Sequence, residues 1–327
     1  MKDLQLGTDI DRAARHLSAG ELVAIPTETV YGLAANALDE TSVARIFKAK
    51  NRPHFDPLIV HSHSFAALLP YLGEIPPAAL KLAESYWPGP LTLLLPRNER
   101  IPDLVTAGLP RVAVRVPRHP LTLELLVKLP FPLAAPSANP FGYISPTRPR
   151  HVLDQLADRV SYVLDGGPCA VGLESTIIGF EPDGEPLIYR RGGLPTAALE
   201  ATLGRSIPAL ETSTSQPQAP GTLHSHYAPR VPLLFGDPAT LIARHHGKRL
   251  ALLSFGATAH DLIKRAAGHI SLSPRGDSIV AAARLFAALR ELDRPDRFDL
   301  IIAEPLPEDG VLAAAVNDRL RRAAAHG

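Results

Sequence analysis

The sequence predicts an α/β protein with two domains, and three features of the chain support this. Over residues 1–203, short apolar runs of strand length alternate with stretches of helical periodicity. Residues 204–230 are rich in Ser, Thr, Pro and Gln and lack periodicity, which is typical of a linker. A second alternation of strands and helices fills residues 231–327. A chain of 327 residues is long enough for two domains.

The first domain is expected to hold a mixed sheet covered by helices. Helices are predicted over 8–20, with Thr8 or Asp9 as the cap and Gly20 past the end, and over 39–50. The apolar and β-branched runs predict strands at 21–25, 56–61, 91–96, 111–116, 132–136, 161–167, 174–180 and 186–193. Strands that alternate with helices in this way favour an α/β or mixed-sheet domain.

The second domain is predicted to contain three strands and three helices. The strands are expected at 231–235, 249–255 and 298–304, and the helices at 238–246, 278–293 and 312–325. This repeated strand–helix pattern is typical of a small Rossmann-like layer sandwich.

Composition narrows the class of protein. Lys plus Arg total 34 and Asp plus Glu total 33, a balance that argues against a dedicated nucleic-acid coat. The single cysteine, Cys169, excludes an internal disulfide framework and fits a reducing compartment. The first residues do not form a secretory signal, and no apolar run approaches the roughly 18 residues of a membrane span. We therefore expect a soluble, cytoplasmic protein.

Common nucleotide and metal signatures are missing from the sequence. There is no P-loop, no G-x-G-x-x-G between a strand and a helix, no zinc-type Cys/His spacing and no G-x-S-x-G. If the protein handles a nucleotide, side chains and ordinary loop amides must hold the phosphates.

Polar residues directly follow the first predicted strand. Thr27, Glu28, Thr29 and Tyr31 come after the apolar run 21–25 and before Gly32. Such groups are costly to bury unless they find partners. One partner they could have is a substrate.

Cations gather at the end of the second predicted helix. Lys48, Lys50 and Arg52 lie where positive charge complements the helix dipole. The alternative is a phosphate clamp, with Lys50 as a point charge and Arg52 as a planar fork. The residues alone leave both interpretations open.

Other polar clusters also fall where apolar strands begin or end. Ser137, Asn139, Ser145 and Thr147 are ordinary turn residues, but they follow a strand at the end where α/β sheets bind ligands. Similar groups are Arg115 between two valines, the run 174–176, and Arg190 with Arg191. The basic residues among them, together with His61 and the Lys50 segment, could converge on a polyanion.

The ordered set of motifs resembles a known family. "PTETVYGL", "AKNRPHFDPLIVH", "WPGPLT", "VAVRVPRHP", "APSAN", "SPT", "ESTII" and "YRRGG" occur in the order of the YrdC-like domain. "APGTLHSHYAP" and the C-terminal helices resemble the two-domain threonylcarbamoyl-AMP synthases of that family. The resemblance implies a twisted, mixed-sheet YrdC-like domain at 1–203, a linker or lid at 204–230, and a small Rossmann-like domain at 231–327.

The resemblance also implies a reaction and its residues. L-threonine, bicarbonate or CO2, and ATP would give threonylcarbamoyl-AMP and pyrophosphate, which feed the modification at position 37 of tRNA through a separate transferase. Mg²⁺ is expected to arrive with ATP, and no metal-binding residues are assigned. The implied catalytic residues are Lys50, Arg52, Ser137 and Asn139. The residues implied to bind threonine are Thr29, His61, Arg115, Ala135 and Ser175. The residues implied to bind ATP are Lys50, Arg52, Asp56, Arg111, Ser137, Ser145, Arg190 and Tyr227.

Three positions depart from the family pattern. Thr222 replaces a usual methionine in the linker, Arg191 a common proline, and Arg111 a frequent small polar residue. In related enzymes the linker folds back over the active site, so Tyr227 is expected to act in a lid that contacts ATP.

Two other classes of function compete with the synthase. The first is a non-catalytic RNA-binding or ribosome-associated protein, which the near-neutral charge disfavours. Direct contact with tRNA is kept as an additional possibility. The second is a carbamoyl-transfer module of hydrogenase maturation, which the lack of acylphosphatase and zinc-finger segments disfavours.

Overall fold

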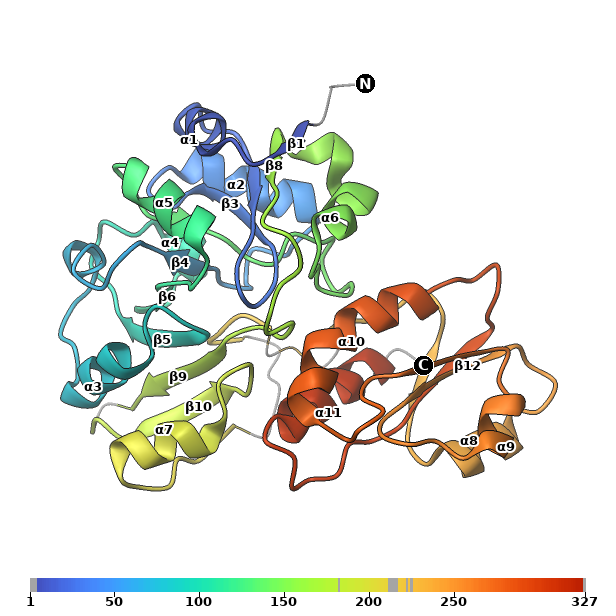
Figure 1. Cartoon of the computed structure of the whole chain (residues 1–327). Helices are drawn as coiled ribbons and strands as arrows, with labels where there is room; N and C mark the ends of the chain where they lie inside the picture. The colour runs from blue at the N-terminus through green and yellow to red at the C-terminus, as the bar shows by residue number, and fades with distance from the viewer. Residues whose placement is uncertain (1–4, 182, 211–216, 222, 224–225, 326–327) are drawn as a thin grey trace. The chain divides into compact units, whose positions relative to one another are not determined.

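A computed structural model describes residues 5–181, 183–210, 217–221, 223 and 226–325. The chain divides into two compact units (Figure 1). The first unit contains residues 1–141, 146–170 and 174–223. The second unit contains residues 142–145, 171–173 and 224–327. Two short segments that come well before the linker in the sequence thus belong to the second unit.

The first unit is built on a ten-stranded mixed sheet in the order β1-β8-β2-β3-β7-β4-β6-β5-β9-β10. Parallel and antiparallel pairs alternate irregularly across it; β4 and β6 are parallel, while β7 is antiparallel to both of its neighbours. The strands are β1 (Gln5–Gly7), β2 (Val23–Ile25), β3 (Gly32–Asn36), β4 (Ile59–His61), β5 (Leu91–Pro96), β6 (Arg111–Arg115), β7 (Leu133–Ala134), β8 (Tyr162–Leu164), β9 (Thr176–Phe180) and β10 (Pro186–Arg190).

Helices pack on both faces of this sheet. On one face, the largest apolar cluster joins the sheet to α2 (Glu40–Lys50), α3 (Pro77–Tyr86), α4 (Asp103–Thr106), α6 (Pro149–Leu156) and α7 (Thr196–Leu203). On the other face, α1 (Ile10–Ser18) and α5 (Pro120–Lys128) cover the β1 end. Further along that face, Ile59, Ala113 and Ile177 pack with Ala219 of the segment 217–221. This second face carries the site.

Local sequence signals fix the first two helices where they were predicted. Asp9 caps α1 by accepting from the N–H of Arg12 at 2.8 Å, and Gly20 follows the helix with a φ of 74°. Asp39 caps α2 through the N–H groups of Thr41 and Ser42. Asn51 ends α2 in the left-handed conformation, which asparagine tolerates better than most residues.

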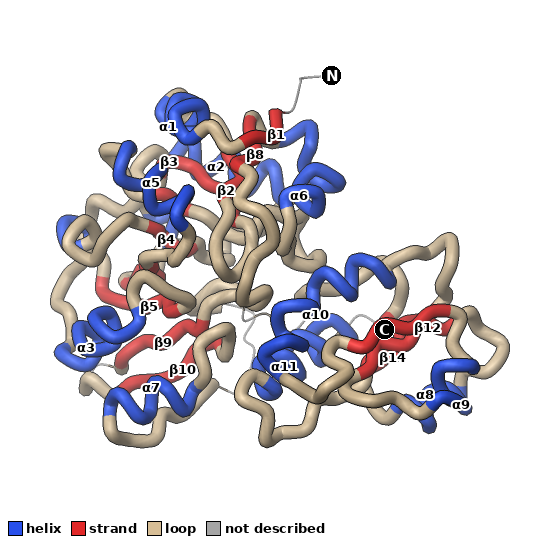
Figure 2. Tube along the Cα trace, in the orientation of Figure 1, coloured by secondary structure: helices blue, strands red, loops and turns tan. Residues whose placement is uncertain are grey.

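The second unit contains a four-stranded parallel sheet in the order β11-β14-β12-β13. Its elements are β11 (Leu233–Phe235), β12 (Leu250–Ser254), β13 (Gly268–Ser271), β14 (Leu300–Ala303), α8 (Pro238–Arg244), α9 (His260–Lys264), α10 (Ser278–Leu292) and α11 (Ala313–Ala324). Figure 2 shows α10 and α11 on one face of this sheet and α8 and α9 on the other.

The structure corrects the sequence-based element list at three strands. The prediction of three strands for the second domain was wrong, because "GHIS" forms a fourth strand, β13, without an apolar run. Strand β3 directly follows the polar stretch 27–31 and was not predicted, since "GLAAN" has small residues and little β-propensity. Strand β1 was not predicted either, because "QLG" contains one apolar residue and no apolar run. Within the described residues, every helix is too short or too polar to cross a bilayer.

Candidate active site

The parallel strands β4 and β6 place His61 and Arg115 side by side. The register pairs these two residues at the carboxyl ends of their strands. Because side chains alternate along a strand, both face the same side as the buried Ile59 and Ala113. Ala135 follows β7, where its N–H donates to the Ile59 carbonyl at 2.9 Å. The sheet thus brings three predicted threonine-binding residues onto one face.

The loop between β2 and β3 is buried, and its polar groups bind other protein groups. The Thr27 hydroxyl donates to the Val30 carbonyl at 2.6 Å and accepts from the N–H groups of Thr29 and Val30. The Tyr31 hydroxyl donates to the Gly167 carbonyl at 2.8 Å. The local bonds of Thr27 and the long-range bond of Tyr31 fix the loop that follows the first predicted strand.

Arg115 links this loop to the sheet. Its Nη2 lies 2.7 Å from Glu28 Oε1, its Nη1 donates to the Thr29 hydroxyl at 2.9 Å, and its Nε donates to the Gly89 carbonyl. The other Glu28 oxygen accepts from the N–H of Arg118 at 2.9 Å. Glu28 therefore sets the orientation of Arg115. Sequence reasoning noticed Glu28 in the polar stretch but did not assign it to the site.

Ser175, just before β9, and Arg190, at the end of β10, are joined by hydrogen bonds. Arg190 Nη2 donates to the Ser175 carbonyl at 3.0 Å, and Arg190 Nη1 donates to the Pro220 carbonyl at 2.9 Å. The Ser175 hydroxyl is 2.7 Å from that of Thr92. Thr92 was not predicted for the site, although it is the one polar residue in the apolar run 91–95.

Lys50 is buried and holds the loop that carries Ser137 and Asn139. Its side chain is 1% exposed and donates to the Ser137 carbonyl at 2.6 Å and to the Asn139 carbonyl. Burial, and then the charge of Arg52, holds the pKa of Lys50 well below its usual value. The neighbouring Lys48 is exposed, so the helix-dipole interpretation suits Lys48 and not Lys50.

Arg52 and Asp56 form a buried pair next to Lys50. Arg52 Nη2 lies 2.9 Å from Asp56 Oδ2, and Arg52 also donates to the carbonyls of Asp56 and Pro57. The side chains are 4% and 0% exposed. Burial raises the pKa of Asp56, although the charges of Arg52, Lys50 and Arg190 act in the opposite direction. All three cations therefore lie close enough to act on this one carboxylate.

Three basic side chains are buried around Asp56. They are Lys50, Arg52 and Arg190, and each acts on the pKa of the Asp56 carboxyl. Arg115 is paired with Glu28. A group of buried basic side chains suits an anionic ligand with more than one negative charge.

Two titratable groups near the site are neutral. Burial, and then Arg115, lowers the pKa of His61 to about 3, so the imidazole is uncharged at neutral pH. Burial raises the pKa of the Cys169 thiol to about 12. A thiol in this state is a poor nucleophile.

The structure does not gather every predicted residue in this cluster. Arg111 lies at the opposite end of β6 from Arg115 and donates to the carbonyl of Phe180 and the hydroxyl of Tyr189. Ser145 and Tyr227 belong to the second unit. Arg191 is exposed, and Thr222 lies outside the described residues.

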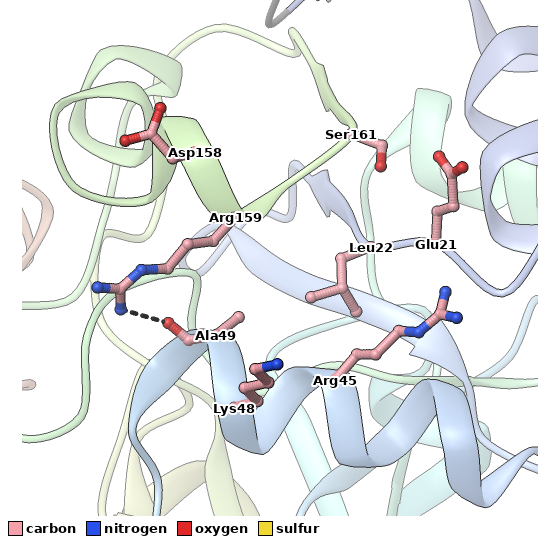
Figure 3. Close-up of a pocket in the computed structure, with 8 residues that line it drawn as sticks. All are labelled: Glu21, Leu22, Arg45, Lys48, Ala49, Asp158, Arg159 and Ser161. Carbon is pink, nitrogen blue, oxygen red and sulfur yellow. Dashed lines mark hydrogen bonds between the residues drawn. The ribbon is translucent and has the colours of Figure 1, made fainter. Parts of the chain in front are cut away.

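A separate hollow of about 400 Å³ lies beside the last turn of α2 (Figure 3). Its lining contains three cations and two carboxylates, whose charges nearly cancel, and includes none of the predicted site residues. Arg159 reaches into it to bind the Ala49 carbonyl at 2.8 Å. The residues are Glu21, Leu22, Arg45, Lys48, Ala49, Asp158, Arg159 and Ser161.

The mixed sheet and its group of buried basic side chains are those of an α/β protein suited to an anionic ligand. Comparison with known proteins narrows this class. Residues 15–192 match the family model described as "Telomere recombination", of the Sua5/YciO/YrdC group, and residues 195–325 match "Threonylcarbamoyl-AMP synthase, C-terminal domain".

Two curated relatives match almost the whole chain. The threonylcarbamoyl-AMP synthase of Pyrococcus abyssi is 41% identical over 96% of this chain and 93% of the relative. That of Bacillus subtilis is 40% identical over 96% and 92%. The chain belongs to the threonylcarbamoyl-AMP synthase family. The family resemblance inferred from the sequence is confirmed.

Solved structures confirm the predicted fold class. The crystal structure of Sua5 from P. abyssi, complexed with L-threonine, aligns with a TM-score of 0.89 at 38% identity over 98% of this chain and 97% of that chain. The YciO structure from E. coli aligns with a TM-score of 0.52 at 22% identity over 58% of this chain and 96% of that one, and it supports the fold of the first unit.

Proposed function

We propose that this chain joins L-threonine, bicarbonate or CO2, and ATP into threonylcarbamoyl-AMP and pyrophosphate. The observation that carries the proposal is the group of buried basic side chains around Asp56, in the same unit as Thr29, His61 and Arg115. A polyphosphate suits these basic side chains, and a small amino acid suits the polar face that carries His61 and Arg115. Membership of the synthase family points to the same pair of substrates.

The threonine subsite is proposed on the face of β4, β6 and β9. Arg115 makes three hydrogen bonds to Gly89, Thr29 and Glu28. A guanidinium has five N–H groups, so with respect to the described residues two remain for a substrate carboxylate. His61, neutral at pH 7, accepts or donates one hydrogen bond without adding charge. Thr29, Ala135 and Ser175 complete the proposed subsite.

The phosphate subsite is proposed around Lys50, Arg52 and Arg190. An incoming polyphosphate compensates these cations and favours the charged form of Lys50. Ser137 and Asn139 contribute loop groups that Lys50 already holds in place. Asp56 is fully buried against Arg52, so its proposed role is to orient that guanidinium. Arg111, Ser145 and Tyr227 are proposed to contact more distant parts of the nucleotide.

The proposed reaction has two bond-forming steps. The threonine amine attacks CO2, which forms an N–C bond and releases a proton. A carbamate oxygen then attacks the α-phosphorus of ATP, and the bond from that phosphorus to the pyrophosphate oxygen breaks. Negative charge grows on the phosphate oxygens, where fixed cations stabilise it. The residues thus act mainly by placing the reactants and by charge stabilisation.

Mg²⁺ is proposed to enter bound to the phosphates of ATP. Among the described residues, no three His, Cys, Asp or Glu side chains are grouped so that they could hold a metal ion. Mg²⁺ commonly binds through substrate phosphates with few protein ligands. We propose further that the protein works in the cytoplasm, that a tRNA threonylcarbamoyl transferase consumes the product, and that direct contact with tRNA is an additional possibility.

One assay tests the proposed reaction. The purified full-length chain is incubated with ATP and Mg²⁺, and pyrophosphate is measured with threonine, bicarbonate, both or neither. Release that needs both substrates, together with threonylcarbamoyl-AMP identified by mass, supports the proposal. No release above the ATP-only rate, combined with tight binding of RNA, would favour the RNA-binding alternative.

A further inference from the structure

Two segments that are neighbours in the sequence of proposed substrate-binding residues belong to the second unit. Residues 142–145 follow Asn139 by three positions and include Ser145. Residues 171–173 directly precede Glu174 and Ser175. Both segments contact α10 or Asp293, the residue that ends it. These contacts give the second unit a specific task.

Asp293 collects several hydrogen bonds in a buried position. The Tyr143 hydroxyl donates to Asp293 Oδ2 at 2.5 Å, and Arg230 Nε donates to the same oxygen at 3.0 Å. The N–H of Val231 donates to Oδ1 at 2.9 Å. Asp293 is 1% exposed, so its carboxylate depends on these donors. Tyr143 is thereby fixed to the carboxyl end of α10.

Arg290, one turn earlier on α10, binds the same segment. Its Nε donates to the Ser145 carbonyl at 3.3 Å, and its Nη2 donates to the Ile144 carbonyl. The guanidinium lies over the Tyr143 ring, 5.1 Å from the ring centre. Arg290 therefore contacts three consecutive residues of the segment, two of them through main-chain groups.

The second segment packs on the middle of α10. A Cβ added at Gly172 would lie 2.5–2.8 Å from the main chain of Ala283, closer than real contacts allow. Gly172 also has a φ of 71°, where side chains are strained. Only glycine fits both conditions. The main chain before Ser175 is thus seated directly on the helix.

We propose that α10 positions two loops that carry proposed substrate-binding residues. Tyr143, Arg290 and Asp293 position the loop of residues 137–147, which is proposed to bind ATP. Gly172 positions the loop of residues 171–175, which carries Ser175. The proposal rests on the proposed function, because it assigns the loops to substrates. It gives the second unit a role in the reaction.

The experiment compares Tyr143→Phe, Asp293→Asn and the double variant with the unchanged full-length chain. Tyr143→Phe removes one hydroxyl and keeps the ring under Arg290. Asp299→Asn is the matched control, because Asp299 pairs with Arg249 at an exposed site in the same unit. Hydrogen exchange of residues 137–147 is measured without substrates, and KM and kcat are measured for ATP and threonine.

The expected result is exchange roughly 10-fold faster over 137–147 in each single variant, from the loss of a buried bond to a charged group. The KM for ATP should rise by a similar factor, while kcat changes less than about 3-fold. The double variant should be no worse than the poorer single variant, because one bond links the two side chains. Asp299→Asn should change neither measurement.

Unchanged exchange and unchanged ATP KM in both single variants would overturn the positioning role. So would an equal loss of kcat with an unchanged KM for ATP, which is the pattern of general destabilisation. If the unchanged chain shows no threonine-dependent release of pyrophosphate, the proposed function fails, yet the exchange measurement still tests whether α10 orders the loop.

Discussion

Glu28 and Arg115, separated by 87 positions, form a buried ion pair with 2.7 Å between Oε1 and Nη2. The two side chains are 5% and 4% exposed. Arg115 stands at the end of β6, and Glu28 stands in the loop after β2, so the pair ties the polar loop to the sheet. Glu28, one of the polar residues after the first predicted strand, is therefore partnered by a protein side chain.

Replacing Glu28 by glutamine should leave Arg115 buried without a counter-charge. We expect Glu28→Gln to lower the free energy of unfolding by roughly 3 kcal/mol, the usual effect of breaking a buried pair from one side. Urea unfolding measures this change. The control is Glu185→Gln, which breaks the exposed pair with Arg205 and should change stability by less than about 1 kcal/mol. Equal small losses in the two variants would show that Arg115 does not depend on Glu28.

Lys50 offers a test of the phosphate subsite. We expect Lys50→Met to lower kcat/KM for ATP by roughly 10²-fold or more, because a fixed cation near developing charge is typically worth about 2.7–4 kcal/mol. Lys48→Met, in the same helical turn but exposed, should keep near-normal turnover. Circular dichroism checks the fold of both. Similar activity in the two variants would remove Lys50 from the mechanism.

The sequence predicted elements well where apolar runs were long. The runs 91–96 and 111–116 became β5 and β6, and the helix over 39–50 is α2. The prediction failed at β13, because "GHIS" has little apolar character and forms a strand through its pairing with β12. Pairing of this kind is a tertiary effect that local composition does not encode.

What the sequence indicated about the site came from local motifs. Family motifs marked Lys50, Arg115 and Ser175, which the end of α2 and the ends of strands place in the first unit. The motifs "PTETVYGL" and "WPGPLT" contain Glu28 and Thr92, but they did not assign these two residues to the site, because their relevance depends on which strands become neighbours. Nor did they show that Tyr143 and Gly172 belong with α10, since no local pattern relates them to residues more than 100 positions away.

The buried, neutral His61 predicts a pH dependence of stability. Its pKa is about 3 in the folded chain and near 6.5 in an unfolded one, so only the unfolded chain takes up a proton between these values. Stability from this group is complete above pH 6.5 and is lost as the pH falls, by up to about 1.4 kcal/mol per unit.

Urea unfolding at pH 7.0 and pH 5.0 tests this sign. The unchanged chain should lose about 2 kcal/mol more than His61→Gln, which cannot take up the proton. His246→Gln, at an exposed position, is the control and should follow the unchanged chain. If His61→Gln and the unchanged chain lose the same stability, the imidazole is not held neutral by the fold.

Substrate analogues test whether the buried loop recognises the threonine hydroxyl. A site that pairs a substrate hydroxyl penalises analogues without it, because its own polar groups are left unpaired. Serine should be a poorer substrate than threonine, and valine poorer still, by kcat/KM from pyrophosphate release. Equal turnover of valine and threonine would show that Thr29 and its neighbours do not recognise the hydroxyl.

The role of Tyr227 in a lid stays a prediction. The packing of its side chain determines which variant can test that role. The side chain is 1% exposed in the second unit, with its ring stacked on Phe286 at 5.3 Å and the Arg319 guanidinium 5.4 Å from the ring centre. Its φ of 66° is unusual for a residue other than glycine. Tyr227→Ala would therefore disturb the second unit as well as any lid, so it cannot separate the two roles.

Tyr227→Phe keeps the stacked ring and removes only the hydroxyl. If the hydroxyl reaches ATP or the product and helps to exclude water, this variant should bind ATP about 10-fold more weakly, the loss of one to two hydrogen bonds. It should also release pyrophosphate in excess of intact threonylcarbamoyl-AMP, because the intermediate is hydrolysed. Thermal unfolding should be nearly unchanged. The lid role fails if Tyr227→Phe keeps the ATP affinity and the one-to-one yield of product and pyrophosphate, since the hydroxyl would then serve only the packing of the second unit.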